Sequence, residues 1–285
     1  MKALRAAGAL AAALCAVVAL AALAAPPAQR LVTVGGAVTE IVHALGAADR
    51  IVATDTTSTW PATAQALPKV GYQRALAAEG VLALRPSHLI ATADAGPPVV
   101  LNQLRGAGVQ VMQLPAEHSA AEVGRSIRAV AAALSMQAAG EAMAARFEQD
   151  WAAARRDIAP LPGKPRVLFI LDHGGGTPMV AGDDTAADAM LGYAGAANVM
   201  AGRFRGYRPL TLEAALAAAP DVIVTTDEAL AAAGGRAAFL ARPGLSALPA
   251  ARAGRLVSMD ALRMLGFGPR LPEAVRELAR AVRAS

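Results

Sequence analysis

Short apolar runs alternate with longer segments of helical periodicity along the first half of the chain. Strands are predicted over residues 30–34, 50–54, 88–92 and 109–114, and helices over residues 38–45, 79–84 and 99–106. Gly35 and Gly36 are expected to form the first turn, and Thr39-Glu40 to open the helix that follows. Because strands that alternate with helices build βαβ units, we expect a parallel sheet in this half.

A long helical pattern separates this half from a second set of alternating elements. It runs over residues 120–158 with a break near Ser135, and it ends at Pro160, Pro162 and Pro165. The second set has strands over residues 167–171, 222–226 and 255–258 and a closing helix over 272–284. The expected fold is α/β, with two lobes whose central, mainly parallel sheets are joined by one long helix. We place the N-terminal lobe at 30–135, the linking helix at 136–160 and the C-terminal lobe at 165–285.

A weak internal repeat supports two related lobes. Each lobe contains a Gly-Tyr pair, a glutamate and a proline before a strand: Gly71-Tyr72, Glu79 and Pro86, then Gly206-Tyr207, Glu213 and Pro220. The glutamate precedes the proline by seven residues in both lobes. Any helix–turn–strand unit resembles another to some degree, but the shared order and spacing favour pseudo-symmetric lobes with equivalent glutamates.

The composition narrows the class of protein. Apolar residues make up 55% and charged residues 17% of the 285 residues, which excludes intrinsic disorder. The mean hydropathy of +0.40 reflects alanine spread along the chain, and only the extreme N-terminus has an uncharged stretch of membrane-spanning length. The net charge of +5 is scattered, and aromatic residues are only 4%, so the chain lacks the basic, aromatic surface of a nucleic-acid-binding protein.

The N-terminus has the three parts of a secretory signal. Lys2 and Arg5 precede an apolar run over residues 6–25, which contains the small-residue cleavage site Ala22-Leu23-Ala24. A retained membrane anchor is the alternative, since the run is about long enough to span a bilayer. The cleavage site and the weakly apolar alanines favour a signal peptide over residues 1–24, whose removal also removes Cys15, the only cysteine. An exported protein without cysteines suits the bacterial periplasm.

Several segments carry a family resemblance. They are Thr33-Val34-Gly35-Gly36 with Thr39-Glu40, then residues 70–74, 78–86, 174–179, 195–199 and 265–270. In these segments the chain resembles the substrate-binding proteins of haem-type ABC importers, in the class whose lobes are joined by a single long helix. The Gly-Tyr pair before Glu79 and the Leu-Gly-Phe-Gly-Pro-Arg segment at 265–270 point to the haem branch. The resemblance implies a monomeric periplasmic receptor, not an enzyme, that captures haem between its lobes and delivers it to an ABC permease and ATPase complex.

Tyr72 and Arg74 are the first candidates for the binding site. Tyrosine is an axial ligand of ferric haem, and a nearby cation favours its ionised form. If the segment is extended, both side chains point to the same side, so that one binds iron and the other a haem propionate. A tyrosine packed at a lobe edge is the plainer interpretation, and the resemblance favours the ligand role. Tyr207 holds the matching place in the second lobe, where packing against the turn is the better explanation.

Glu79 and Glu213 each stand at the start of a predicted helix. The helix dipole favours a carboxylate there, which explains each glutamate alone. It does not explain why they occupy equivalent positions in two lobes. In the proteins that the chain resembles, such glutamates meet arginines of the membrane permease, and the resemblance implies that docking role here.

His173 and Arg236 are further candidates for contact with the ligand. His173 opens a His-Gly-Gly-Gly segment that matches the oxyanion motif of lipases, but the chain has no Gly-x-Ser-x-Gly nucleophile elbow, so a hydrolase is rejected. His173 is then either a second haem contact or a loop histidine in water. Arg236, expected on a loop after two glycines, is either a partner of a propionate or of Tyr72, or a solvated charge. Arg270 is expected to cap or anchor the closing helix.

Other ligands of the same fold stay open. A ferric siderophore or a corrinoid is the nearest alternative to haem. The four histidines, His43, His88, His118 and His173, match no compact zinc motif, so a histidine-ligated metal receptor requires three of them to converge in the cleft.

Overall fold

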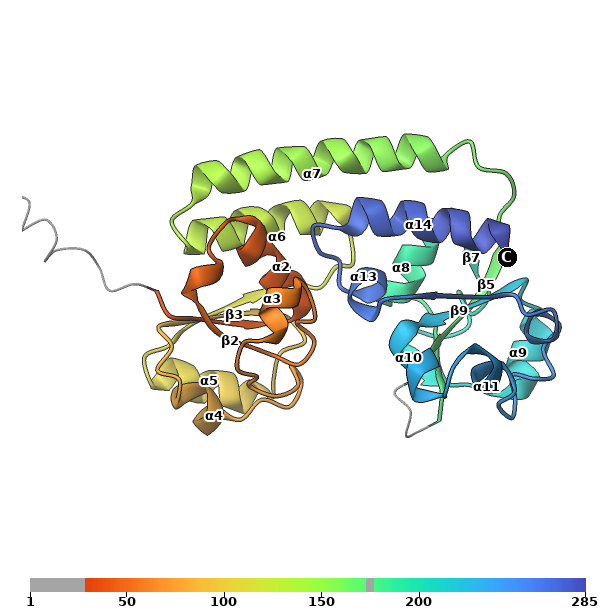
Figure 1. Cartoon of the computed structure of the whole chain (residues 1–285), viewed down its shortest axis with the longest axis horizontal. Helices are drawn as coiled ribbons and strands as arrows, with labels where there is room; N and C mark the ends of the chain where they lie inside the picture. Colours follow the sequence, from red (N-terminus) through yellow and green to blue (C-terminus); the bar gives the residue numbers. More distant parts are fainter. Residues whose placement is uncertain (1–28, 173–176) are drawn as a thin grey trace, which may run out of the picture.

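The computed structural model describes residues 29–172 and 177–285. These residues form two α/β lobes that lie side by side beneath a layer of long helices (Figure 1). The N-terminal lobe is drawn in red to yellow, the C-terminal lobe in green to blue, and the green α7 (Gln137–Ile158) runs above both. The expected class of two α/β lobes with mainly parallel sheets is confirmed. The predicted signal peptide, residues 1–24, lies outside the described residues.

The N-terminal lobe has a four-stranded sheet that is parallel throughout. Its strands are β1 (Leu31–Val34), β2 (Ile51–Thr54), β3 (His88–Thr92) and β4 (Gln110–Leu114), in the order β2-β1-β3-β4. Its helices are α2 (Gly36–Ala44), α3 (Ala62–Gln65), α4 (Ala78–Leu82) and α5 (Pro98–Gly106), with a 3-10 turn at Ala48–Arg50. All four residues of β1 are buried, which is typical of a parallel strand covered on both faces.

Helix α2 begins earlier than the sequence predicts. Gly35 makes the turn with a φ of 98°, a conformation that glycine adopts without steric cost. Thr39 and Glu40, expected to open the helix, therefore lie about one turn inside it and are buried. The hydroxyl of Thr39 lies 2.7 Å from the hydroxyls of both Thr33 and Ser58, and this contact ties α2 to β1.

The C-terminal lobe has a six-stranded sheet of mixed direction. Its parallel part comprises β5 (Arg166–Leu171), β9 (Val222–Thr226), β10 (Leu256–Met259) and the short β7 (Ala197–Asn198). Two strands that the sequence did not predict, β6 (Met179–Ala181) and β8 (Tyr207–Pro209), extend the sheet in antiparallel pairing. The helices are α8 (Ala186–Tyr193), α9 (Leu212–Ala218), α10 (Asp227–Ala232), α11 (Arg236–Leu240), α12 (Pro249–Arg252), α13 (Ala261–Leu265) and α14 (Leu271–Ala284).

Helices α6 (Ala120–Ala133), α7 and α14 form the layer that joins the lobes. The expected break near Ser135 separates α6 from α7, and Ser135 itself takes a positive φ of 58°. Gly140 of α7 lies so close to Ala131 of α6 that a side chain at Gly140 would collide with it. At the far end of α7, Asp157 pairs with Arg276 of α14 at 2.7 Å. The long helix therefore packs on one helix from each lobe.

One hydrophobic cluster extends through this layer into both lobes. It includes Ile41 and Val123 from the N-terminal lobe together with Met264 and Val275 from the C-terminal lobe, all at most 1% exposed. Each lobe also has a smaller hydrophobic cluster of its own. None of the described helices has the length and apolar character needed to cross a membrane.

Candidate functional site

A cavity of about 440 Å³ lies between the two lobes. Its walls are built where strands end: Gly35 and Gly36 follow β1, Thr92 and Leu114 end β3 and β4, and Leu171 and Thr226 end β5 and β9. The carboxyl ends of both sheets thus face the same space. Ligands of open α/β sheets bind at this edge, so the cavity is the candidate binding site.

A buried carboxylate holds the N-terminal wall in shape. Asp55 is fully buried, and one of its oxygens accepts hydrogen bonds from the Gly35 N–H at 2.9 Å and the Ser58 hydroxyl at 2.8 Å. Its other oxygen accepts from the N–H and the hydroxyl of Thr57, at 2.9 and 2.6 Å. Because Gly35 and Thr57 line the cavity, these bonds fix two segments of its wall.

Tyr72 lines the cavity and remains 44% exposed. The chain turns here, so the condition for Tyr72 and Arg74 to point to the same side, an extended segment, is not met. The Ala75 N–H donates to the Tyr72 carbonyl at 2.8 Å, which closes a turn, and Gly71 enters that turn with a φ of 97°. The Gly71 carbonyl accepts from the N–H of Thr56, another lining residue, at 2.9 Å. The backbone that carries the phenol is therefore anchored on the cavity wall.

Arg74 lies beside the cavity instead of lining it. In the turn its guanidinium pairs with Asp94, a residue that does line the cavity, at 2.5 Å. The pKa of Arg74 is raised, mainly by this hydrogen bond, and the phenols of Tyr72 and Tyr207 contribute electrostatically. Asp94 therefore already engages the charge of Arg74.

The second Gly-Tyr pair has a different environment. Tyr207 lies in β8 and packs against the hydrophobic cluster that joins the lobes. Burial raises the pKa of Tyr207 to about 12, against hydrogen bonds from Ala187 and Thr185 that lower it. Tyr207 does not line the cavity, so the two tyrosines of the internal repeat are not equivalent.

Glu79 and Glu213 do occupy equivalent places. Each is exposed and lies in the first turn of a short helix, α4 or α9. Within the described residues, neither carboxylate forms an ion pair. Both helices lie on the side of the lobes away from α7 (Figure 1). The two carboxylates are therefore available to a partner on that side.

The structure places Arg236 away from the cavity, and His173 falls outside the described residues. Arg236 is the first residue of α11 instead of a loop residue, because Gly235 makes the turn before it with a φ of 105°. Its guanidinium donates to the Gly254 carbonyl at 2.6 Å. Asp172, just before the glycine-rich segment, is buried and pairs with Arg242.

His118, which the sequence offered only as one of four histidines of a possible metal site, lines the cavity. It precedes the N-cap of α6 with a φ of 49°, and its ring centroid lies 5.4 Å from that of Phe267 in the other lobe. In the described ranges, neither His43 nor His88 lines the cavity, and no group of three possible metal ligands gathers. The convergence that a histidine-ligated metal receptor requires is thus not seen in residues 29–172 and 177–285.

The charges of the cavity are unevenly distributed. Its described lining includes the carboxylates of Asp94, Glu122 and Glu228 but no lysine or arginine, so His118 is the one lining side chain there that can become cationic. The C-terminal wall is largely apolar, with Leu171, Leu262, Leu265 and Phe267. This arrangement suits a ligand with a large apolar surface.

Comparison with known proteins agrees with this geometry. Residues 31–262 match the model of a family described as periplasmic binding protein. The solved structure of the periplasmic haem-binding protein BhuT with two haems is 52% identical, with a TM-score of 0.84 over 90% of this chain and 98% of that one. The apo form of RhuT, a periplasmic haem-binding protein from Roseiflexus sp. RS-1, is 38% identical, with a TM-score of 0.87 and the same coverage.

A relative found by sequence is also described as an ABC transporter substrate-binding protein. The uncharacterized ABC transporter substrate-binding lipoprotein YvrC of Bacillus subtilis (strain 168) is 28% identical over 262 residues, which are 89% of this chain and 80% of YvrC. The family match covers most of the chain, and the two-lobed fold with an interlobe cavity accords with it. This chain therefore belongs to the periplasmic binding protein family.

Proposed function

We propose that this chain is a periplasmic receptor that binds haem between its lobes and hands it to an ABC importer. The observation that carries the proposal is the exposed phenol of Tyr72 on the wall of an interlobe cavity whose opposite wall is apolar. The similarity to BhuT and RhuT, both named as haem-binding proteins, supports haem over other flat ligands. The chain acts as a monomeric carrier without chemistry of its own.

Tyr72 is the proposed iron ligand. A phenolate binds ferric iron directly, and the turn that carries Tyr72 holds its side chain at the cavity with little to reorganise. Arg74 lies on the same turn, and its exposed pair with Asp94 is of the kind that contributes little to stability and exchanges readily. A haem propionate that arrives beside Tyr72 displaces Asp94 as the partner of Arg74.

Delivery is the proposed role of Glu79 and Glu213. A transporter built on two-fold symmetry presents the same docking surface twice, and each lobe has one exposed glutamate, on α4 or on α9, the helices on the side away from α7. Cationic side chains on the permease then meet both lobes at once, which fixes the orientation of the receptor. The signal proposed for residues 1–24 places the protein in the periplasm, where this encounter takes place.

Titration of the purified protein with hemin tests the ligand. We expect hemin to bind saturably, with the visible spectrum of high-spin ferric haem ligated by tyrosinate. In parallel titrations, a corrinoid and a ferric siderophore should bind more weakly. Tight binding of either of these with no saturable hemin spectrum would assign the cavity to that ligand and refute haem. Metal analysis of the purified protein addresses the metal-receptor alternative, because a histidine site would retain stoichiometric metal.

A further inference from the structure

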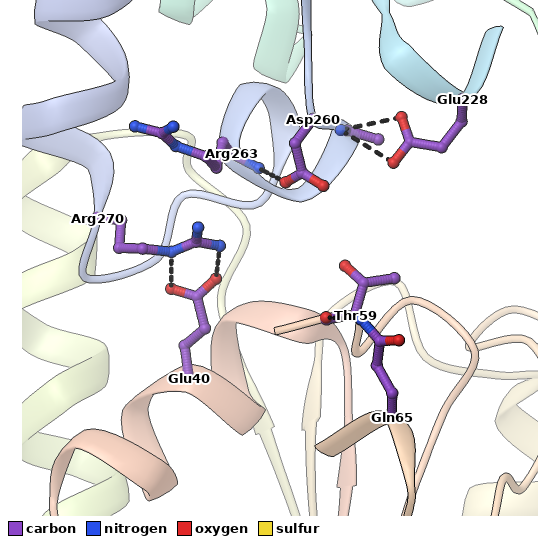
Figure 2. Close-up of polar contacts among 8 residues, drawn as sticks. Glu40, Thr59, Gln65, Glu228, Asp260, Arg263 and Arg270 are labelled. Atoms are coloured by element: carbon purple, nitrogen blue, oxygen red, sulfur yellow. Dashed lines mark hydrogen bonds and ion pairs between the residues drawn. The ribbon is translucent and has the colours of Figure 1, made fainter. Parts of the chain in front are cut away.

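A buried ion pair crosses from one lobe to the other next to the cavity. The Glu40 carboxylate on α2 accepts two hydrogen bonds from Arg270, from Nε at 3.1 Å and from a terminal nitrogen at 2.5 Å (Figure 2). The Glu40 side chain is only 5% exposed, and 230 positions separate the partners in sequence. Arg270 also lies over the ring of Trp60, 4.7 Å from its centroid. Its role is thus wider than the helix anchor expected from the sequence.

The backbones around this pair approach each other closely. A side chain at Gly268 would come within 3.1 Å of the Glu40 carboxylate, and one at Gly36 would meet Leu262 of α13 at 2.4 Å. At Gly36 that side chain would also come within 2.8 Å of the Thr57 carbonyl, so a residue larger than glycine at either position would require its neighbours to shift. Figure 2 shows α13 held in turn by Asp260, which accepts from the Arg263 N–H, and by Glu228, which accepts from the Ala261 N–H.

The joined segments are themselves the walls of the cavity. Gly36 and Ala37, one turn before Glu40, line its N-terminal wall, and Gly266 and Phe267, just before Arg270, line its C-terminal wall. Any change in the Glu40–Arg270 geometry moves both walls relative to each other. We propose that Glu40 and Arg270 are positioning residues that set the width of the cavity and hold it open to the correct spacing before the ligand arrives.

The chemistry of the pair favours positioning over a gain in stability. Burying two charges costs desolvation free energy that their attraction often only offsets, whereas the planar, two-pronged geometry of an arginine fork fixes distance and angle. Burial raises the pKa of Glu40, and Arg270 opposes that rise. Asp260 and Arg263 are the other charged groups that act on Glu40, with opposite signs. The bidentate bond to Arg270 is therefore the polar contact that we assign to the positioning of the two walls.

Distance measurements between the lobes test the proposal without any ligand. The full chain carries Cys15→Ser together with Gln103→Cys on α5 and Ala217→Cys on α9, both exposed positions, and spin labels report the interlobe distance distribution. Arg270→Lys keeps the charge but removes the fork, and Glu40→Gln keeps the shape but removes the charge. Asp157→Asn, which removes the α7–α14 ion pair far from the cavity, is the matched control.

We expect a single narrow distribution for the unmodified pair and for Asp157→Asn, and a broadened or shifted one for Arg270→Lys and, less strongly, for Glu40→Gln. Hemin affinity should fall about tenfold in Arg270→Lys with an unchanged spectrum, because the ligand must then order the lobes itself. An unchanged distribution with unchanged affinity would overturn the proposal, and so would a lower melting temperature with neither change. The hemin titration rests on the proposed function, but the spin-label distance measurement does not. A wild type that fails to bind hemin would therefore count against haem and leave the positioning test intact.

Discussion

The two Gly-Tyr pairs occupy matching places in the internal repeat, yet the fold uses them differently. Tyr72 follows an isolated bridge between Thr54 and Lys69 and lies on a turn at the cavity. Tyr207 follows a comparable bridge between Asp183 and Arg205, but β8 then pairs with β6 and packs the phenol against the hydrophobic cluster that joins the lobes. Repetition of a sequence pattern therefore predicts where the backbone goes, while neighbouring strands decide what a side chain can do.

Replacing the two tyrosines one at a time should separate their roles most clearly. Tyr72→Ala removes the proposed iron ligand and should weaken hemin binding by more than about 100-fold, with loss of the tyrosinate spectrum. Tyr207→Phe removes only a buried hydroxyl and should leave spectrum and affinity unchanged. Hemin titration followed in the Soret region measures both. The same loss in both variants, or in neither, would mean that the tyrosines are equivalent after all.

Glu79 and Glu213 keep equivalent positions in the two lobes, so replacing them tests the part of the internal repeat that the fold preserves. Glu79→Lys and Glu213→Lys should each reduce haem uptake in proteoliposomes strongly, and the double variant should reduce it to background, because like charges would then oppose the cationic side chains proposed on the permease. Hemin titration of all three should match the wild type. Glu273→Lys, in the first turn of α14 on another face, is the control and should transport normally. Normal uptake by the double variant would reduce both glutamates to helix-end carboxylates.

Arg74 and Asp94 should give the smallest effects, and of opposite sign. Arg74→Ala removes the cation beside Tyr72 and should weaken hemin binding about two- to fivefold, the range of an exposed ion pair. Asp94→Asn releases Arg74 and removes a repelling carboxylate from the cavity, so affinity should rise by a similar factor. Titrations at low and high salt should show both effects shrink as salt screens them. Weaker binding by Asp94→Asn would indicate that Asp94 holds Arg74 in place instead of competing for it.

Most of the framework was predictable because it rests on periodic apolar patterns. Strands such as β3 and β9 occur at the predicted residues, and the break at Ser135 separates two helices as expected. The antiparallel β6 and β8 escaped prediction because three residues are too few to show alternation. Their pairing depends on contacts between distant segments, which no local pattern encodes.

The binding site was predictable only where a local sequence motif marks it. Tyr72 lines the cavity, as the Gly-Tyr motif and the family resemblance suggested. Three other features could not be predicted, because they join residues that are remote in sequence or depend on a turn. They are the Arg74–Asp94 pair, the position of His118 at the cavity and the Glu40–Arg270 bond. Gly36 and Gly268 were the available signal for the last of these, because each lies where a segment of the other lobe comes close.

The hydrophobic cluster shared by α6, α7, α14 and both lobes has a consequence for how the chain denatures. Severing the chain between α6 and α7 would leave each half with an apolar surface open to water, so neither half is a self-sufficient folding unit. Heat or denaturant should then melt the whole molecule in one cooperative transition, despite its bilobed outline. The lobes are separate as walls of a binding site but inseparable as a folding unit.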